Sequence, residues 1–376
     1  MNAAANTGRS AGGVRIAILH DALVLPSGSE KLALYMSEVF PDAPVYTSAY
    51  LPENTHPEFK NKNVITLPLG RAVKSELQFK GLFPWWYLGF STLDLSGYDI
   101  LLSSANYLAK YINPPRGAVH ICYLHNPFRF LWKPEVYSVD SVPYPRPLIM
   151  GIRALLPLLR RIDLSRTRKI PHLLTNSQNT ARQIQAVYRR DAEVIYPPIR
   201  IGEFILSPDP GEYYLYAGRL ISHKRVDLAI EACARLGRRL VVAGEGPERA
   251  ALQRQAGSEV VFTGRYSIEQ LRGLYAGCRA LIFPSDEDFG LVPVEAQASG
   301  RPVIAYRSGG ALETVREGET GLFFDRQDAD ALGAALERFE RMTFDPQRIR
   351  ENALRFDFSV FRERLLAFVD RVKIQM

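Results

Sequence analysis

The chain has 376 residues, 47% of them hydrophobic, and a formal net charge of +7 at pH 7, so it is long enough for two domains with separate cores. Its cysteines, Cys122, Cys233 and Cys278, are dispersed among apolar neighbours, which excludes a disulfide framework and indicates a reducing compartment. No apolar run reaches the ~18 residues of a membrane-spanning helix and no signal peptide precedes Val14, so we expect a cytoplasmic protein.

The N-terminal part predicts a strand and a helix joined by a polar loop. Residues 1–13 look like a disordered leader, and Val14 to Asp21 is an apolar run typical of a buried strand. A helix is expected from Glu30 to Phe40, with Ser27 or Ser29 as its N-cap.

A second apolar run, Ile121 to Pro127, carries polar residues where the predicted strand ends. Ligands of open α/β sheets bind at the carboxyl ends of strands. We therefore consider Asp21, Asn126 and Arg129 as candidate acceptor-binding residues. His125 is similarly placed, although a lone histidine is more often structural than functional.

Two segments of the first half combine basic and apolar residues. Between Arg146 and Lys169, seven basic residues accompany the single acid Asp163, and residues 80–90 place aromatic side chains beside Lys80. This composition suits an anionic bilayer, on the inner face of the plasma membrane. Alternatively, both segments pack as helices of the first domain with a solvated basic face. Nucleic acid is not expected, because no reading module accompanies the basic residues.

In the second half, three apolar runs end in glycine turns. Gly218 follows the first run, and Arg219 and Lys224 then point toward the same cleft, where fixed cations can stabilise a departing nucleoside diphosphate. The turns at residues 241–247 and 260–266 repeat the pattern, each after a predicted strand.

Glu287 and Glu295 stand eight positions apart in the segment that follows the apolar run 279–284. Leu291 to Ser299 is predicted as a short helix; if the whole segment were helical, the carboxylates would lie ~12 Å apart on nearly one face. Carboxylates accept hydrogen bonds from vicinal hydroxyls, and the N–H groups of a helix start suit a diphosphate. No cluster with metal-ligand spacing is found, so we expect no metal, with two cations in its place.

Aliphatic strands alternate with helical stretches along the chain, which predicts an α/β fold of parallel βαβ units. We expect a first domain over residues 14–200 and a second over 201–356. The linker is expected near Pro197-Pro198 and Ser207-Pro-Asp-Pro-Gly211.

The Glu287-x7-Glu295 spacing, with Phe289-Gly290 and the element Gly218-Arg-Leu-x-x-x-Lys224, resembles the signature of retaining glycosyltransferases of the GT4 family. The resemblance covers nearly the whole chain. It implies the GT-B fold, two Rossmann-like domains with parallel sheets facing across a cleft. It also implies an N-terminal acceptor-binding domain, a C-terminal nucleotide-sugar-binding domain, and a final helix (357–376) that packs back onto the first domain.

The resemblance also implies roles for the residues of the site. Glu295 would hold the ribose, Arg219 and Lys224 the diphosphate, and Glu287 the sugar hydroxyls. His125 would contact the transferred sugar near its reacting carbon. The other donor-binding candidates are Gly28, Gly218, Gly244, Arg265, Tyr266, Phe289, Gly290 and Leu291.

Residues 26–31 resemble the family's Gly-Gly-x-Glu loop, in which Ser27 replaces the first glycine and Gly28 remains. His20-Asp21-Ala-Leu and residues 124–129 look similar to mannosyltransferases of O-antigen assembly. GDP-mannose is therefore the first expected donor, a UDP-hexose the second, and a polyprenyl-diphosphate-linked sugar or a glycan the acceptor. A sugar-nucleotide epimerase of the same architecture and an inactive nucleotide-sugar-binding protein are the alternatives.

Overall fold

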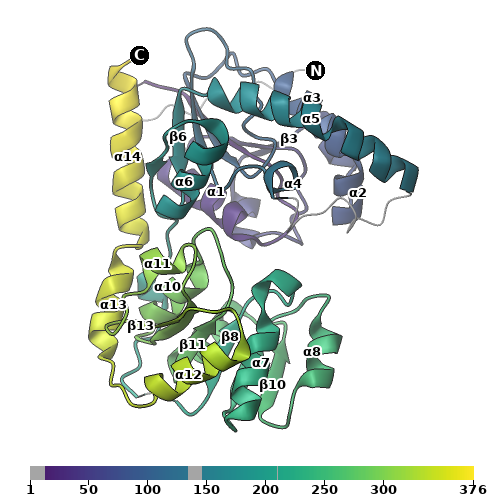
Figure 1. Cartoon of the computed structure of the whole chain (residues 1–376). Helices are drawn as coiled ribbons and strands as arrows, with labels where there is room; N and C mark the ends of the chain where they lie inside the picture. Colours follow the sequence, from purple (N-terminus) through teal and green to yellow (C-terminus); the bar gives the residue numbers. More distant parts are fainter. Residues whose placement is uncertain (1–12, 134–145, 210) are drawn as a thin grey trace. The chain divides into compact units, whose positions relative to one another are not determined.

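A computed structural model describes residues 13–133, 146–209 and 211–376 (Figure 1). The chain divides into two compact units. Unit 1 contains the chain up to Tyr196 together with Arg362–Met376, and unit 2 contains Pro197–Phe361. The leader predicted at residues 1–13 lies outside the described residues except for Gly13, as do the side chains of Lys80 and Arg146.

Unit 1 is built on a seven-stranded parallel sheet with the order β3-β2-β1-β4-β5-β6-β7. Its strands are β1 (Ile16–His20), β2 (Val45–Thr47), β3 (Val64–Thr66), β4 (Ile100–Ala105), β5 (Val119–Leu124), β6 (His172–Thr175) and β7 (Glu193–Val194). All residues of β1 and β4 are buried, because helices and loops cover both faces of a parallel sheet.

The helices of unit 1 follow the strands in the alternation that the sequence predicts. They are α1 (Gly28–Val39), α2 (Glu76–Gly81), α3 (Phe83–Ser91), α4 (Arg129–Trp132), α5 (Arg146–Arg168) and α6 (Gln178–Tyr188). Short 3-10 turns occupy Pro57–Asn61 and Pro68–Ala72. The predicted cap of α1 is confirmed, since Ser27 Oγ accepts a hydrogen bond from Glu30 N at 3.3 Å.

The last helix, α14 (Phe358–Ile374), begins in unit 2 and ends in unit 1. Its C-terminal half contacts the sheet of unit 1 near β6 and β7, where Arg371 pairs with Glu193 at 2.7 Å and Phe368 meets the ring of His172 edge-on. These contacts place α14 along the edge of unit 1 that carries β6 and β7.

Unit 2 is built on a six-stranded parallel sheet with the order β10-β9-β8-β11-β12-β13. Its strands are β8 (Tyr214–Ala217), β9 (Leu240–Ala243), β10 (Val260–Gly264), β11 (Ala280–Phe283), β12 (Val303–Tyr306) and β13 (Gly321–Phe324). Its helices are α7 (Val226–Arg235), α8 (Arg249–Gln255), α9 (Ile268–Gly277), α10 (Leu291–Ala298), α11 (Ala311–Thr314), α12 (Ala329–Phe339) and α13 (Pro346–Leu354). The predicted α/β fold with two Rossmann-like parallel-sheet domains is therefore confirmed.

In both sheets the strand order reverses beside the first strand. The chain of unit 1 runs outward through β1, β2 and β3 and then returns to place β4 on the other side of β1. In unit 2, β8 and β11 have the same relationship. Crevices at the carboxyl ends of such strand pairs are the usual ligand sites of open α/β sheets, so each unit has one position where a site is expected.

Candidate functional site

At the reversal point of unit 2, residues from two predicted motifs meet. Lys224 follows β8, Glu287 follows β11, and Lys224 Nζ forms an ion pair with Glu287 Oε1. The two side chains are 20% and 23% exposed, so the pair remains accessible. Ser285 Oγ donates a second hydrogen bond to Glu287 Oε1 at 2.8 Å. The basic element and the acidic element of the sequence thus form one site.

Arg219 lies in the turn directly after β8 and is exposed. Within the described part of the chain, its guanidinium has no hydrogen bond or ion pair. The turn is held by Tyr216, whose hydroxyl donates to Arg219 O at 3.1 Å. Arg225 is occupied differently, because it pairs with Asp227 at 3.0 Å. Arg219 can therefore reach an anionic ligand, whereas Arg225, at the N-cap position of α7, is held by Asp227.

The glycine turns after β8 and β9 are paired with each other through their backbones. Gly218 N donates to Ala243 O and Leu220 N donates to Glu245 O, both at 2.9 Å. A Cβ at Gly244 would lie 1.9 Å from Gly218 O, and one at Gly246 would lie 2.2 Å from Leu220 O. Glycine is needed at these positions for the close approach of two loops, which stiffens the turn that carries Arg219.

A third glycine pair, Gly309-Gly310, supports Glu287 and was not identified from the sequence. Gly310 N donates to Glu287 O at 2.8 Å. A Cβ at Gly310 would lie 2.2 Å from Phe289 Cα, so a side chain cannot be accommodated. The available signal in the sequence was the pair of adjacent glycines, separated by two residues from the end of β12, because such a pair marks a close backbone approach.

Helix α10 starts at Leu291, as predicted, and its N-cap Gly290 has φ of +85°. Residues 285–290 form a loop, so the helical geometry considered for the whole Glu287–Glu295 segment does not apply. Phe289 is buried and its ring packs edge-on against Phe356 at 5.5 Å between centroids. The ring of Phe289 therefore belongs to the core of unit 2.

Glu295 lies in the second turn of α10 and accepts a hydrogen bond from Tyr275 Oη at 2.8 Å. Tyr266 lies near the same carboxylate, and its pKa is raised by burial and then by the charge of Glu295. Arg265, the preceding residue, is exposed. The predicted ribose residue Glu295, on α10, and the donor-binding candidate Tyr266, just after β10, thus lie close together within unit 2.

At the reversal point of unit 1, His20, Ser104 and His125 form a chain of hydrogen bonds. His20 Nδ1 lies 3.0 Å from Ser104 O and 3.1 Å from Ser104 Oγ, and His125 Nε2 lies 2.9 Å from the same Oγ. Burial lowers the pKa of His125 to about 3, so its ring is neutral at pH 7. Asn176 Nδ2 donates to His125 O at 2.9 Å and fixes the main chain.

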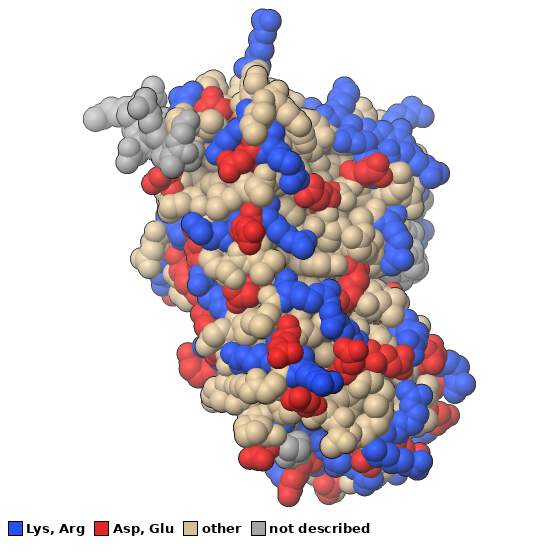
Figure 2. Space-filling model, turned by 90° about the vertical axis from the view of Figure 1, so that its left-hand side faces the viewer, with Lys and Arg blue, Asp and Glu red and all other residues tan. Residues whose placement is uncertain are grey.

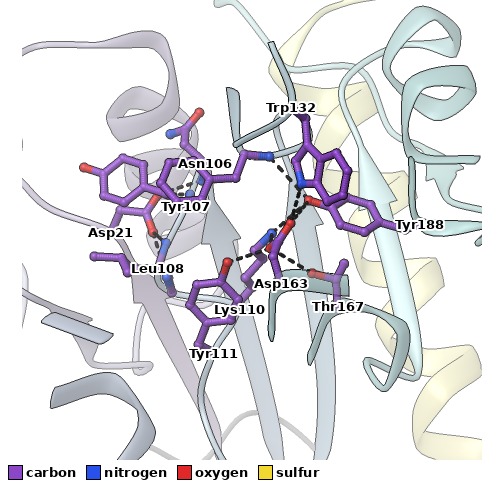
Figure 3. Close-up of polar contacts among 12 residues, drawn as sticks. Asp21, Asn106, Tyr107, Leu108, Lys110, Tyr111, Trp132, Asp163, Thr167 and Tyr188 are labelled. Carbon is purple, nitrogen blue, oxygen red and sulfur yellow. Dashed lines mark hydrogen bonds and ion pairs between the residues drawn. The ribbon is translucent and has the colours of Figure 1, made fainter. Parts of the chain in front are cut away.

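The residues of unit 1 that are candidates for binding the sugar acceptor differ in the contacts that their side chains already make. Asn126 Nδ2 donates to Asn106 Oδ1 at 3.3 Å, and Arg129 opens α4. Asp21 is buried, and its carboxylate accepts four backbone N–H groups at 2.6–3.1 Å, from residues 106–109 (Figure 3). A carboxylate has about four lone-pair positions, and these four hydrogen bonds fill them. Asp21 therefore holds a loop and is not available to bind the sugar-acceptor substrate.

The same loop is anchored at its other end by a buried ion pair. Lys110 Nζ lies 2.5 Å from Asp163 Oδ1, and both side chains are fully buried. Tyr111, Trp132 and Tyr188 also donate to the Asp163 carboxylate, at 2.6–2.8 Å (Figure 3). The single acid of the basic segment is thus a structural residue that ties α5 to the loop after β4.

The loop before α1 is also held by a buried carboxylate. Glu30 Oε1 accepts hydrogen bonds from Val24 N at 3.0 Å and Leu25 N at 2.9 Å, and Thr55 donates to Oε2. Burial raises the pKa of Glu30 to about 7. Gly28 is exposed as the first residue of α1, where backbone N–H groups can meet an anion.

The described residues, 13–133, 146–209 and 211–376, contain neither a metal-binding cluster nor a membrane-spanning helix. No group of three or more His, Cys, Asp or Glu side chains in this part of the chain could hold a metal ion. Of the helices in the same part, none has the length and apolar character needed to cross a bilayer.

Comparison with known proteins places the second unit in a family. Residues 201–356 match Glycosyl transferases group 1. The O-antigen chain mannosyltransferase RfbU of Salmonella typhimurium is 25% identical over 255 residues, which cover 65% of this chain and 71% of that protein. A GDP-mannose-dependent alpha-(1-6)-phosphatidylinositol monomannoside mannosyltransferase of Mycolicibacterium smegmatis is 38% identical over 136 residues, covering 31% of this chain and 36% of that protein.

Solved structures agree with the fold over nearly the whole chain. Sucrose-phosphate synthase from Thermosynechococcus elongatus matches with a TM-score of 0.73 and 19% identity, covering 96% of this chain and 100% of that structure. Anabaena Alr3699/HepE in complex with UDP-glucose matches with a TM-score of 0.68 and 18% identity, covering 95% and 99%. At these identities the likeness establishes the architecture, which is that of the GT-B glycosyltransferases.

Proposed function

Residues 201–356 of this chain are a Glycosyl transferases group 1 domain, and from that premise we propose that the protein is a retaining mannosyltransferase. It would move mannose from GDP-mannose to a lipid-linked or polysaccharide acceptor in the synthesis of a cell-surface glycan. The observation that carries the proposal is the accessible Lys224–Glu287 pair at the reversal point of the unit 2 sheet. The names of the mannosyltransferase relatives support the choice of sugar.

The chemistry follows from the charges of these residues. In the transfer step, the bond between the sugar C1 and the diphosphate oxygen breaks, and a bond forms between C1 and an acceptor hydroxyl oxygen on the same face. The acceptor's proton passes to the leaving phosphate. Arg219 and Lys224 would stabilise the negative charge that gathers on the diphosphate, and Glu287 would accept hydrogen bonds from sugar hydroxyls. Because the turn after β8 supplies both cations to the site, we propose that transfer needs no divalent ion.

A panel of nucleotide sugars tests the donor. GDP and GDP-mannose should raise the melting temperature of the protein, because a ligand that binds only the native state stabilises it. If only UDP-sugars stabilised the protein, a UDP-sugar would replace GDP-mannose as the proposed donor. The assignment as a glycosyltransferase would be unchanged. Interconversion of a nucleotide sugar without an acceptor would indicate an epimerase, and binding without transfer or interconversion an inactive binder.

We also propose that unit 1 binds an anionic membrane surface through α5 and α3. Residues 149–162 of α5 include no buried side chain, and the helix exposes Met150, Leu155 and Leu158 by 68%, 52% and 53%. On α3, Trp85 and Leu88 are 59% and 51% exposed. The two helices are linked, since Arg166 Nε donates to Tyr87 Oη at 3.3 Å.

The charges of α5 favour a bilayer over a protein partner of mixed charge. Its single acid, Asp163, is fully buried, so the exposed charges of its described residues are all arginines. On the side of the molecule that carries α14, by contrast, Figure 2 shows basic and acidic side chains interspersed. Arginines beside exposed Leu and Trp suit the interface of an anionic bilayer, where a lipid-linked acceptor would also lie.

A further inference from the structure

His125 is the residue of unit 1 that the resemblance to GT4 glycosyltransferases assigns to the transferred sugar, and its two ring nitrogens differ in their surroundings. Nε2 lies 2.9 Å from Ser104 Oγ. Nδ1 has no hydrogen-bond partner among the described residues, and it is not fully buried. Nδ1 is therefore the nitrogen that keeps access to a ligand, and its protonation decides what His125 can do.

The donor and acceptor roles in the His20–Ser104–His125 chain can be assigned in order. His20 Nδ1 lies 3.0 Å from the carbonyl oxygen of Ser104, which can only accept, so the Nδ1 atom of His20 carries a proton. That N–H also points to Ser104 Oγ at 3.1 Å, and the hydroxyl therefore accepts from His20. The hydroxyl proton of Ser104 is left to donate to His125 Nε2.

The opposite arrangement leaves a polar group without a partner. If His125 donated from Nε2, Ser104 Oγ would accept from both histidines, and its own proton would have no acceptor. Ser104 is fully buried, and a buried hydroxyl without a hydrogen-bond acceptor costs about 1–3 kcal/mol. With Nε2 as an acceptor and burial keeping the ring neutral, the single proton of His125 lies on Nδ1.

We infer that His20 and Ser104 hold His125 in the tautomer protonated at Nδ1, so that this ring donates a hydrogen bond to a substrate oxygen instead of accepting a proton. The inference rests on the proposed function for the identity of the substrate, a hexosyl donor or its acceptor hydroxyl. His20 and Ser104 are positioning residues, because they act through His125. The partner of one ring nitrogen fixes the tautomer and thereby the role of the other nitrogen.

The same strand offers a matched control. Ser103, the neighbour of Ser104 on β4, forms a comparable buried pair, with its Oγ 2.8 Å from His120 Nε2. Successive side chains of a strand point to opposite faces, so this second pair lies on the other face of the sheet. Ser103→Ala removes a buried Ser–His hydrogen bond of similar geometry without touching His125.

The tautomer is read from long-range 1H–15N NMR correlations of 15N-histidine-labelled protein, which needs no substrate. The chain has six histidines, so single replacements can assign the His125 signals. We expect the Nδ1–H pattern in the wild type, in Ser103→Ala and in His20→Asn, whose amide keeps a donor toward Ser104. Ser104→Ala and His20→Leu should show a mixture of tautomers. An Nε2–H pattern in the wild type would overturn the inference.

Turnover measures whether the tautomer matters to the reaction. Ser104→Ala and His20→Leu should lower kcat by about 10- to 100-fold with little change in KM, as expected when a positioned donor is misaligned. Ser103→Ala and His20→Asn should stay within about 3-fold of the wild type. Full turnover in Ser104→Ala would refute the positioning role. If the wild type transfers no sugar at all, the proposed function fails, whereas the NMR result still decides the tautomer.

Discussion

Lys224 and Glu287 form an ion pair although they follow different strands of unit 2, and their side chains are one-fifth to one-quarter exposed. A pair that stays open to solvent contributes on the order of 1 kcal/mol to stability, because solvent screens it and side-chain entropy opposes it. Its position at the reversal of the sheet therefore points to function rather than to the fold.

Substitution of either residue should distinguish a role of the pair in catalysis from a role in stability. Lys224→Ala and Glu287→Ala should each lower kcat at least about 100-fold, because each removes a charge that is fixed before the transition state. Their melting temperatures should stay close to that of the wild type. The control is Arg235→Ala, which breaks the exposed pairs of this α7 residue with Glu231 and Asp330 and should change neither quantity. Near-normal turnover in both site variants would remove the pair from the mechanism.

The buried pair of unit 1 should behave in the opposite way. Lys110→Met leaves the Asp163 carboxylate buried without its cation and should lower the free energy of unfolding by about 3–5 kcal/mol. Lys60→Met breaks the exposed pair with Glu53 and should cost less than about 1 kcal/mol. Chemical denaturation measures both, and equal losses would contradict the structural role given to Asp163.

The contrast between these pairs shows what sequence reasoning can and cannot reach. The start of α10 was predicted, because the change from a polar loop to an apolar helix after Gly290 is a local signal. Lys224 and Glu287 were both identified, but their contact was not, because it depends on the order of strands β8 and β11. Asp163 looked like a lone acid in a basic segment. Its partner Lys110 lies far away in the chain, and residue periodicity carries no information about such contacts.

The role of Asp21 also could not be determined from the sequence alone. Its place at the end of β1 made it a candidate for ligand binding, and the strand end was predicted correctly. The four backbone N–H groups that fill its carboxylate come from residues 106–109, in a loop without a recognisable motif. A carboxylate at a strand end can serve a ligand or a loop, and only the tertiary structure distinguishes the two.

Glu30 gives a prediction about pH. Burial raises its pKa from 4.5 to about 7 in the folded protein, so the folded state binds more protons than the unfolded state between these values. The contribution of this group to stability should therefore be full below about pH 4.5 and should be lost as the pH rises through about 7.

The variant Glu30→Gln isolates this effect. A glutamine can accept from Val24 and Leu25 through its oxygen and donate to Thr55 through its amide, so the loop should keep its hydrogen bonds. Unfolding free energies of the wild type and the variant, measured from pH 5 to 8, should diverge in favour of the variant as the pH rises. Parallel curves would show that Glu30 does not titrate in this range. Buried histidines titrate in both proteins and cancel in the comparison.

The last prediction concerns the bilayer. Wild-type protein should co-sediment with vesicles of phosphatidylglycerol and phosphatidylcholine but much less with phosphatidylcholine alone, because the exposed charges of α5 are basic. Leu155→Glu with Leu158→Glu should weaken binding to the mixed vesicles, since two exposed apolar side chains become acidic. Leu312→Glu, at an equally exposed leucine of unit 2, should bind as the wild type does. If the control weakens binding as strongly as the α5 variant, the contact is not made by α5. If vesicles of phosphatidylcholine alone bound the protein equally well, recognition of lipid charge would be excluded. Arginine side chains are not attracted to a lipid that carries no net charge.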